Sequence, residues 1–181
     1  GIALDLPMRY RKYATAGFAT PSGRLEIYSE SFLRHGYAPV PRGDAPAAGG
    51  DAFPLTMLSV KQVAYCHSQM RTLSSLRRLS PEPIAELHPV TAASRGITEG
   101  VWLRVTSARG SIAGKTRFNA ALDPAVVCVS YGWHEATQPE LAAELPPGVT
   151  LNFAAVVDPE ACDPASGSDA LKRVPCEVSL L

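Results

Sequence analysis

Residues 101–118 read VWLRVTSARGSIAGKTRF. Apolar and polar side chains alternate over residues 101–106 and again over 111–118, and this period of two predicts two half-buried β-strands. The intervening Ala108, Arg109 and Gly110 are typical of a tight turn, so the two strands are predicted to form a hairpin. The stretch indicates a mainly β fold.

Further strand-like segments lie on both sides of this hairpin. Residues 53–60 and 125–129 are almost wholly apolar, which predicts strands buried on both faces. Residues 83–87 and 174–180 also fit strands, and a helix is expected at 89–95, with Pro89 at its first position and Gly96 after its end. Short strands without a βαβ rhythm predict a closed or nearly closed β-barrel.

The N-terminal part of the chain differs in composition. Residues 1–17 are mixed and basic, a helix is possible at 24–34, and residues 39–50 are rich in Pro, Gly and Ala, as linkers are. We therefore expect an arm and linker over residues 1–52 and a barrel domain over 53–181.

Composition narrows the function. Among 181 residues, 17 Lys and Arg balance 17 Asp and Glu, which argues against a nucleic-acid binder. No apolar run approaches the roughly 20 residues of a membrane span. The four cysteines form no C-x-x-C pair, so no metal or iron–sulfur site is predicted, and Cys128 and Cys176 are expected to be small core residues. The chain begins with Gly1 and has no signal-peptide pattern, so we expect a piece of a longer polypeptide, in the cytoplasm or the periplasm.

Two polar segments are candidates for ligand binding. Residues 65–72 (YCHSQMRT) follow one apolar strand and residues 163–172 (DPASGSDALK) precede another. Small residues, hydroxyls and a cation suit recognition of a polar, anionic small molecule, whereas neither segment pairs a base with a nucleophile for catalysis. Each segment also has a plainer interpretation: the first as a self-satisfied polar loop with a surface arginine, the second as an ordinary turn. The aromatic-rich residues 131–134 suit either a flat ligand or core packing by Trp133.

The order of these features resembles the C-terminal domain of molybdopterin oxidoreductases, the dimethyl-sulfoxide-reductase superfamily. The resemblance covers residues 18–181 and is carried by these segments in order: 20–26, 53–61, 67–69, 81–89, 96–111, 124–134, and then Asn152, 163–167 and Lys172.

The resemblance implies a double-psi β-barrel of about six strands, with short helices and an N-terminal arm. It also implies that the chain binds molybdopterin guanine dinucleotide at one rim, through three contact segments. These would be Ser59, Lys61, His67, Ser68, Gln69 and Arg71; then Tyr131, Gly132 and Trp133; then Asn152, Asp163 and Lys172. The loops 61–71, 131–134 and 163–172 should converge there and expose Lys61, His67, Gln69 and Asn152.

In this family the metal, molybdenum or tungsten, is held by upstream domains. The chain is therefore expected to carry no catalytic or metal-ligating residue and to be inactive alone. Its expected partners are those upstream domains and an electron-transfer subunit.

Two alternatives stay open at this point. A small barrel could act alone as an enzyme like the pyruvoyl decarboxylases, which cleave themselves before a serine, and the pair Gly167-Ser168 could serve as the cleavage site. It could also be a protein-interaction module.

Overall fold

The computed structural model describes residues 10–41, 43 and 50–181. The chain divides into two compact units, residues 1–44 and 45–181. Most of the predicted linker, and residues 1–9 of the predicted arm, lie outside the described residues. The predicted division between residues 52 and 53 stays a prediction.

The first unit holds two helices of five residues, α1 (Lys12–Ala16) and α2 (Glu30–Arg34). The helix predicted at 24–34 forms only over its last five residues, because Ser29 caps it there by accepting a hydrogen bond from the Phe32 N–H at 3.2 Å. No described residue of 10–41 is buried.

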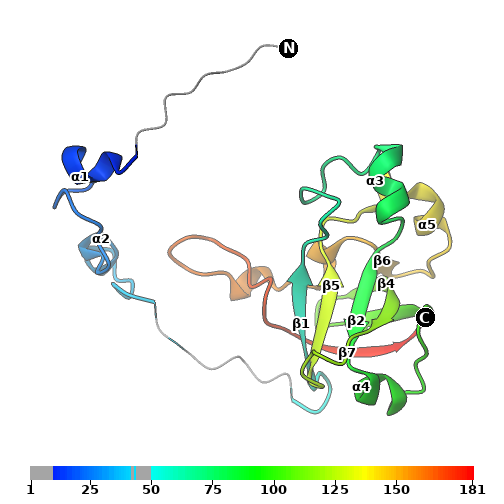
Figure 1. Ribbon diagram of the computed structural model, residues 1–181. Helices are drawn as coiled ribbons and strands as arrows, with labels where there is room; N and C mark the ends of the chain where they lie inside the picture. Colours follow the sequence, from blue (N-terminus) through cyan, green and yellow to red (C-terminus); the bar gives the residue numbers. More distant parts are fainter. Residues whose placement is uncertain (1–9, 42, 44–49) are drawn as a thin grey trace. The chain divides into compact units, whose positions relative to one another are not determined.

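The second unit is a closed barrel of six strands in the order β2–β5–β1–β7–β3–β4, and pairing of β4 with β2 closes it. A seventh strand, of two residues, pairs in parallel with the first two residues of β4, Ser111 and Ile112. In Figure 1, β1 and β5 stand side by side. The strands are β1 (Leu55–Val60), β2 (Ile84–Leu87), β3 (Trp102–Thr106), β4 (Ser111–Phe118), β5 (Val126–Ser130), β6 (Val149–Thr150) and β7 (Val174–Leu180).

The pairing scheme has an internal two-fold pattern. Exchanging β1, β2 and β3 for β4, β5 and β7 leaves every pairing of the six barrel strands unchanged. The parallel pair β1–β5 becomes the parallel pair β4–β2, and the antiparallel pair β1–β7 becomes β4–β3. The barrel therefore consists of two interlocked units of three strands, in agreement with the predicted double-psi class.

The barrel interior is filled by every second side chain of the strands. In β1, Leu55, Met57 and Ser59 are buried, whereas Leu58, which lies between Met57 and Ser59, is only half-buried. The prediction that residues 53–60 are buried on both faces is therefore wrong, because the outer face of β1 is only partly covered. In β5, by contrast, four consecutive residues from Val127 to Ser130 are buried. Cys128 and Cys176 are buried as expected, and burial raises the pKa of the Cys176 thiol to about 12.

The helices of the second unit are short connectors. They are α3 (Ser74–Leu79), α4 (Pro89–Ala93), α5 (Pro139–Ala143) and three 3₁₀ turns: η1 (Glu135–Thr137), η2 (Phe153–Val156) and η3 (Pro159–Ala161). At the start of α4, the His88 Nδ1 accepts from the Val90 N–H at 3.1 Å, and Pro89 occupies the first turn as predicted.

Candidate functional site

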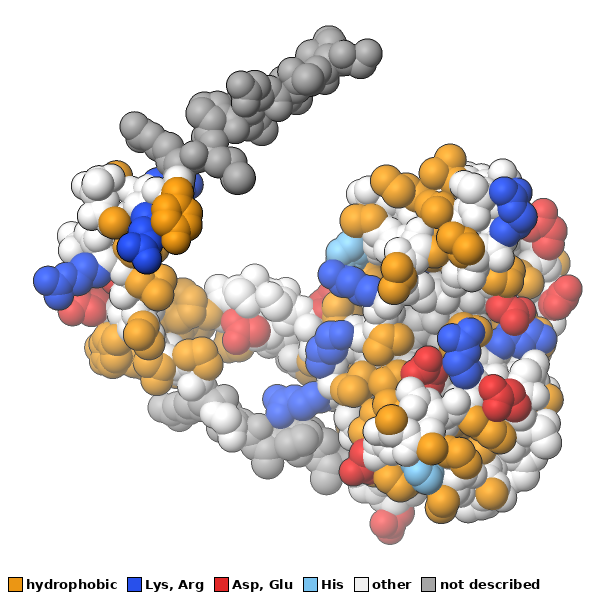
Figure 2. Space-filling view, in the orientation of Figure 1, with side chains coloured by type: hydrophobic (Ala, Val, Ile, Leu, Met, Phe, Trp, Pro, Cys, Tyr) orange, Lys and Arg blue, Asp and Glu red, His pale blue; other side chains and the backbone are white. Residues whose placement is uncertain are grey.

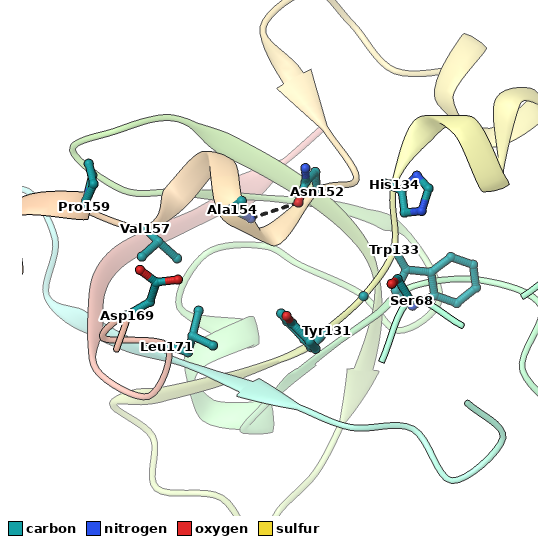
Figure 3. A pocket seen from close by; sticks show the side chains of 11 residues that line it. Ser68, Tyr131, Trp133, His134, Asn152, Ala154, Val157, Pro159, Asp169 and Leu171 are labelled. Atoms are coloured by element: carbon teal, nitrogen blue, oxygen red, sulfur yellow. Dashed lines mark hydrogen bonds between the residues drawn. The ribbon is translucent and has the colours of Figure 1, made fainter. Parts of the chain in front are cut away.

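A pocket lies at the end of the barrel where β1 and β5 finish. These strands run parallel, so their last residues, Val60 and Ser130, pair at the same end, and the polar loops that follow them start there. The pocket, which we call the rim pocket, has a volume of about 460 Å³. Three stretches of chain line it (Figure 3): Ser68; then Tyr131, Gly132, Trp133 and His134; then Asn152, Ala154, Val157, Pro159, Asp169 and Leu171.

Arg71 joins the first two stretches. Its side chain is only 1% exposed, and its guanidinium carbon lies 4.2 Å from the ring centres of both Tyr65 and Trp133. Its Nη2 donates to the carbonyl oxygens of His67 at 2.9 Å and Tyr131 at 2.8 Å. The two aromatic faces offset part of the cost of burying the cation, so Arg71 can hold the first loop against the chain that follows β5.

The charge of Arg71 has no acidic partner in the part of the chain that the structure describes. Two of its nitrogens, Nε and Nη1, are buried without a hydrogen-bond partner there. Burial lowers the pKa of the guanidinium from its ordinary value, yet an arginine stays protonated at any physiological pH. A positive charge therefore lies beside the rim pocket.

Gly132 makes the close contact between these two stretches possible. Its φ is +91°, and an added Cβ would lie 2.4 Å from the carbonyl oxygen of His67 and 2.8 Å from the nitrogen of Ser68. Any larger residue would collide with backbone atoms, which cannot swing away. The His67–Ser68 peptide thus rests directly on Gly132.

A small second hydrophobic core supports the loops from outside the barrel. Tyr65, Trp133 and Leu151 are its buried members. The Trp133 Nε1 donates to the Gln62 Oε1 at 3.0 Å, and the Tyr65 hydroxyl donates to the Ser80 carbonyl at 2.5 Å. Both polar tips are thereby satisfied, as buried Tyr and Trp require.

The third stretch is tied to the second through Glu135. Its carboxylate accepts hydrogen bonds from the Thr150 hydroxyl and, at 2.8 Å, from the Leu151 N–H. Burial alone would raise the pKa of Glu135, but these hydrogen bonds lower it below its ordinary value. Asn152 then starts η2 by accepting from the Ala154 N–H at 3.1 Å (Figure 3).

Residues 163–172 form an exposed turn held mostly by its own side chains. The Asp163 carboxylate accepts from the Ala165 N–H, and from both the N–H and the hydroxyl of Ser166. The turn is anchored to the barrel at its end, where Lys172 Nζ donates to the Ser59 carbonyl and the Ser59 N–H donates to the Leu171 carbonyl at 3.0 Å.

Of the twelve site residues predicted from the sequence, five line the rim pocket: Ser68, Tyr131, Gly132, Trp133 and Asn152. The convergence of the three loops is therefore confirmed as geometry. The prediction that Lys61, His67, Gln69 and Asn152 are exposed is also confirmed. Trp133, however, is 1% exposed and packs in the second core as well.

The other seven do not line the rim pocket. The His67 ring packs edge-on against Tyr131, with ring centres 5.5 Å apart. Gln69 forms an isolated bridge with Cys66 across the tip of the first loop. Lys61 lines a separate cavity of about 570 Å³ beside α3. The remaining four, described above, are Ser59, Arg71, Asp163 and Lys172.

Sequence reasoning missed several residues of the pocket wall, among them His134 and Asp169. Asp169 belongs to a segment singled out for its polarity, but nothing in the sequence distinguishes its carboxylate from that of Asp163. In Figure 3, Asp169 and Leu171 lie on one side of the pocket and His134, Trp133 and Ser68 on the other. The Asp169 Oδ1 accepts from the Cys162 thiol at 3.2 Å.

Within the described residues no group of His, Cys, Asp and Glu side chains could hold a metal ion. None of the helices described there is long and apolar enough to cross a membrane.

The family model described as "Molydopterin dinucleotide binding domain" matches residues 55–175, more than half of the chain. The chain belongs to this family. Its members bind a molybdopterin-type dinucleotide, which agrees with the resemblance found in the sequence. The matched region contains every strand of the barrel except most of β7, and the whole wall of the rim pocket.

Relatives of known name are similar to this chain over about two thirds of its length. It is 29% identical over 139 residues to a putative dimethyl sulfoxide reductase of Halobacterium salinarum (its catalytic chain), covering 66% of this chain and 16% of that protein. It is also 29% identical over 124 residues to the acetylene hydratase of Syntrophotalea acetylenica, covering 64% of this chain and 17% of that protein. The chain thus spans about a sixth of the length of these relatives.

A solved structure, acetylene hydratase from Pelobacter acetylenicus, superposes with a TM-score of 0.74 at 25% identity, covering 92% of this chain and 24% of that one. These likenesses favour the molybdopterin dinucleotide-binding domain. They favour neither the pyruvoyl-type enzyme nor the interaction module that the sequence left open.

Proposed function

We propose that the rim pocket binds the nucleotide end of molybdopterin guanine dinucleotide, and that the chain serves as the C-terminal domain of a larger molybdenum or tungsten oxidoreductase. The observation that carries the proposal is the meeting of three distant loops at one pocket within the region matched by the family.

The chemistry of the pocket wall fits such a ligand. The Ser68 hydroxyl and the Asn152 amide can donate to phosphate or sugar oxygens, and the rings of Tyr131 and His134 offer surfaces for a flat heterocycle. The carboxylate of Asp169 can accept from a purine that presents two adjacent N–H donors, as guanine does and adenine does not. This last feature supports the guanine form of the cofactor.

The seven predicted residues that do not line the pocket keep a part in the proposal. Lys61, His67 and Gln69 are exposed on the first loop, where they can reach a ligand larger than the pocket. Ser59 and Lys172 anchor the third stretch through their mutual hydrogen bond, and Asp163 shapes its turn. Arg71 holds the first loop in place.

The metal and the reaction would lie elsewhere in the larger protein. Relatives that share this domain bear names as different as reductase and hydratase, so we infer that the domain binds the cofactor without choosing the reaction. Alone, the chain should have no redox activity. When bound in the whole protein, the cofactor would supply the metal centre at which that reaction takes place.

Other domains of the same polypeptide are the proposed partners, along with an electron-transfer subunit. Four large apolar side chains of the first loop and α3 are exposed: Val63, Met70, Leu73 and Leu79. Figure 2 shows hydrophobic side chains gathered over this part of the barrel unit. Apolar surface of this kind marks a face that another protein surface covers.

Nucleotide titrations test the guanine form. Guanosine diphosphate should bind the chain more tightly than adenosine diphosphate, measured by isothermal calorimetry. Asp169→Asn should remove most of that preference, because the amide offers one acceptor where the carboxylate offers two. Glu99→Gln makes the same chemical change at an exposed residue outside the pocket and should alter nothing. Equal affinity for the two nucleotides in the unmodified chain would contradict the guanine assignment.

Cofactor content tests the wider proposal. In the larger protein, Gln69→Ala, Lys172→Ala and Asn152→Asp should each lower occupancy, since each removes about one polar contact of roughly 1–3 kcal/mol. Asn152→Asp keeps the oxygen that caps η2, but it replaces the amide donor with an acceptor and adds a negative charge, which also opposes a phosphate. Molybdenum or tungsten and pterin are measured per protein. Full occupancy in all three variants would rule out this binding surface.

A further inference from the structure

Two peptide units beside Arg71 share one hydrogen-bond donor. The carbonyl oxygens of His67 and Tyr131 both accept hydrogen bonds from the one Nη2 atom of Arg71. No peptide bond in the described residues is cis, and in a trans peptide the N–H points opposite to the C=O. The N–H groups of Ser68 and Gly132, which belong to these same two peptides, therefore both point away from Arg71.

These two N–H groups are free to bind something else. Neither donates a hydrogen bond to any group among residues 10–41, 43 and 50–181. Ser68 and Gly132 both line the rim pocket, whereas Arg71 does not. The peptides are also close neighbours, since the Ser68 nitrogen would lie 2.8 Å from a Cβ on Gly132.

We propose that Arg71 is a positioning residue that aligns the N–H groups of Ser68 and Gly132 as a paired donor for one phosphate group of the ligand. The identity of that ligand rests on the proposed function, but the paired donor itself requires only an anionic oxygen. Backbone N–H groups that face a concavity can bind anions in this way.

Arg71 acts through the backbone and does not touch the ligand. Its guanidinium is enclosed by Tyr65 and Trp133 and bound to two carbonyls, so it cannot reach into the pocket without leaving all four groups. Its uncompensated charge adds a favourable field for an anion on the far side of the two peptides. A buried arginine that serves only stability would leave anion binding unchanged once the protein is folded.

Amide NMR of the ¹⁵N-labelled chain, titrated with inorganic pyrophosphate and separately with guanosine diphosphate, tests this assignment. Pyrophosphate should shift the Ser68 and Gly132 amide protons downfield. Arg71→Met should weaken pyrophosphate binding at least tenfold while leaving most other barrel resonances in place. Arg71→Lys, which keeps the charge and a donor, should recover part of the affinity. Arg95→Met, which removes a half-buried arginine that is paired with Glu177, should not change it.

Gly132→Ala provides a second route if Arg71→Met fails to fold. It leaves Arg71 in place but forces the His67–Ser68 peptide away, so pyrophosphate affinity should fall similarly. Pyrophosphate binding that leaves the Ser68 and Gly132 amides unshifted would overturn the proposal, as would undiminished affinity in folded Arg71→Met or Gly132→Ala. Loss of guanosine diphosphate preference with pyrophosphate binding intact would reject the proposed function and leave the paired donor standing.

Discussion

The first two stretches of the rim pocket and the last part of the third, residues 163–172, are built differently. Residues 65–71 and 131–134 are joined by buried, long-range contacts: a guanidinium between two rings, a backbone collision avoided by Gly132, and a tryptophan in a second core. Residues 163–172 are exposed or half-buried and are held mainly by hydrogen bonds within the turn, which the N–H and hydroxyl of Ser166 donate to the Asp163 carboxylate. The difference indicates a preformed half and an adjustable half of one pocket.

Such an arrangement suits a ligand with two unlike ends. A rigid half presents donors in fixed geometry at little cost on binding, whereas an exposed turn can adapt to a ligand of variable position. Because the two halves depend on different contacts, substitutions in them should have effects of different size.

The largest expected effect is that of Trp133→Ala. Removing this buried ring takes away one of the two aromatic rings that contact the Arg71 guanidinium, and it leaves a cavity in the second core. The free energy of unfolding should therefore fall by about 3–5 kcal/mol. The control is the other tryptophan, the half-buried Trp102 on β3, whose replacement by Ala should cost only roughly 1–2 kcal/mol. Urea denaturation followed by far-UV circular dichroism measures both. Equal losses would mean that the first two loops are not held by a core of their own.

Two glycines give a closer comparison. Gly132 and Gly167 both have positive φ, +91° and +68°, but a Cβ on Gly167 would meet nothing within 4 Å. Gly167→Ala should therefore cost about 1 kcal/mol of unfolding free energy for its left-handed backbone alone, whereas Gly132→Ala should cost ~3 kcal/mol because backbone must also move. Thermal unfolding of the pair separates the two cases. A larger loss at Gly167 would reverse the assignment of rigid and adjustable halves.

The smallest effect concerns pH. Hydrogen bonds from the Ser166 N–H and hydroxyl, and then from the Ala165 N–H, hold the pKa of Asp163 below its ordinary value. Because the pKa of Asp163 is depressed in the folded chain, the ionised carboxylate stabilises the turn at pH values above the pKa of an unfolded aspartate, about 3.9. This stabilisation is lost as the pH falls through the pKa of the folded chain. The Ser166 amide resonance should therefore titrate with a midpoint below about 3.9, which is the ordinary value for Asp.

Asp163→Asn keeps an acceptor oxygen and should abolish that titration without opening the turn. The amide of Gly132, in the rigid half, should not follow the same curve. A midpoint at or above the ordinary aspartate value would mean that the Asp163 hydrogen bonds do not persist in solution.

The sequence predicted the barrel well because period-two alternation is a local signal. Strands expected at 111–118 and 174–180 have those bounds in β4 and β7, and the other four barrel strands differ by at most two residues at either end. The two-residue β6 was missed, because so short a segment carries no periodicity. The helix expected at 24–34 was too long, because a pattern of helix formers does not locate the Ser29 cap.

The site was predicted at the level of loops and not of individual side chains. Polar segments next to apolar strands identified the loops, and parallel strand ends brought them together. The place of Arg71 could not be predicted, because the carbonyl of Tyr131 that binds it is sixty positions away in the chain. A surface arginine and a buried one look the same in sequence; only the two rings that enclose it decide between them.

The position of β7 in the barrel has a consequence for how the domain is made. This strand follows all the others along the chain, yet it lies between β1 and β3. During synthesis the earlier strands emerge with β1 and β3 each lacking a neighbour, and the ring cannot close until β7 arrives. Contacts between such distant segments slow folding and leave unpaired strand edges exposed in the meantime. Nascent chains stalled before residue 174 should therefore be the form most in need of a chaperone.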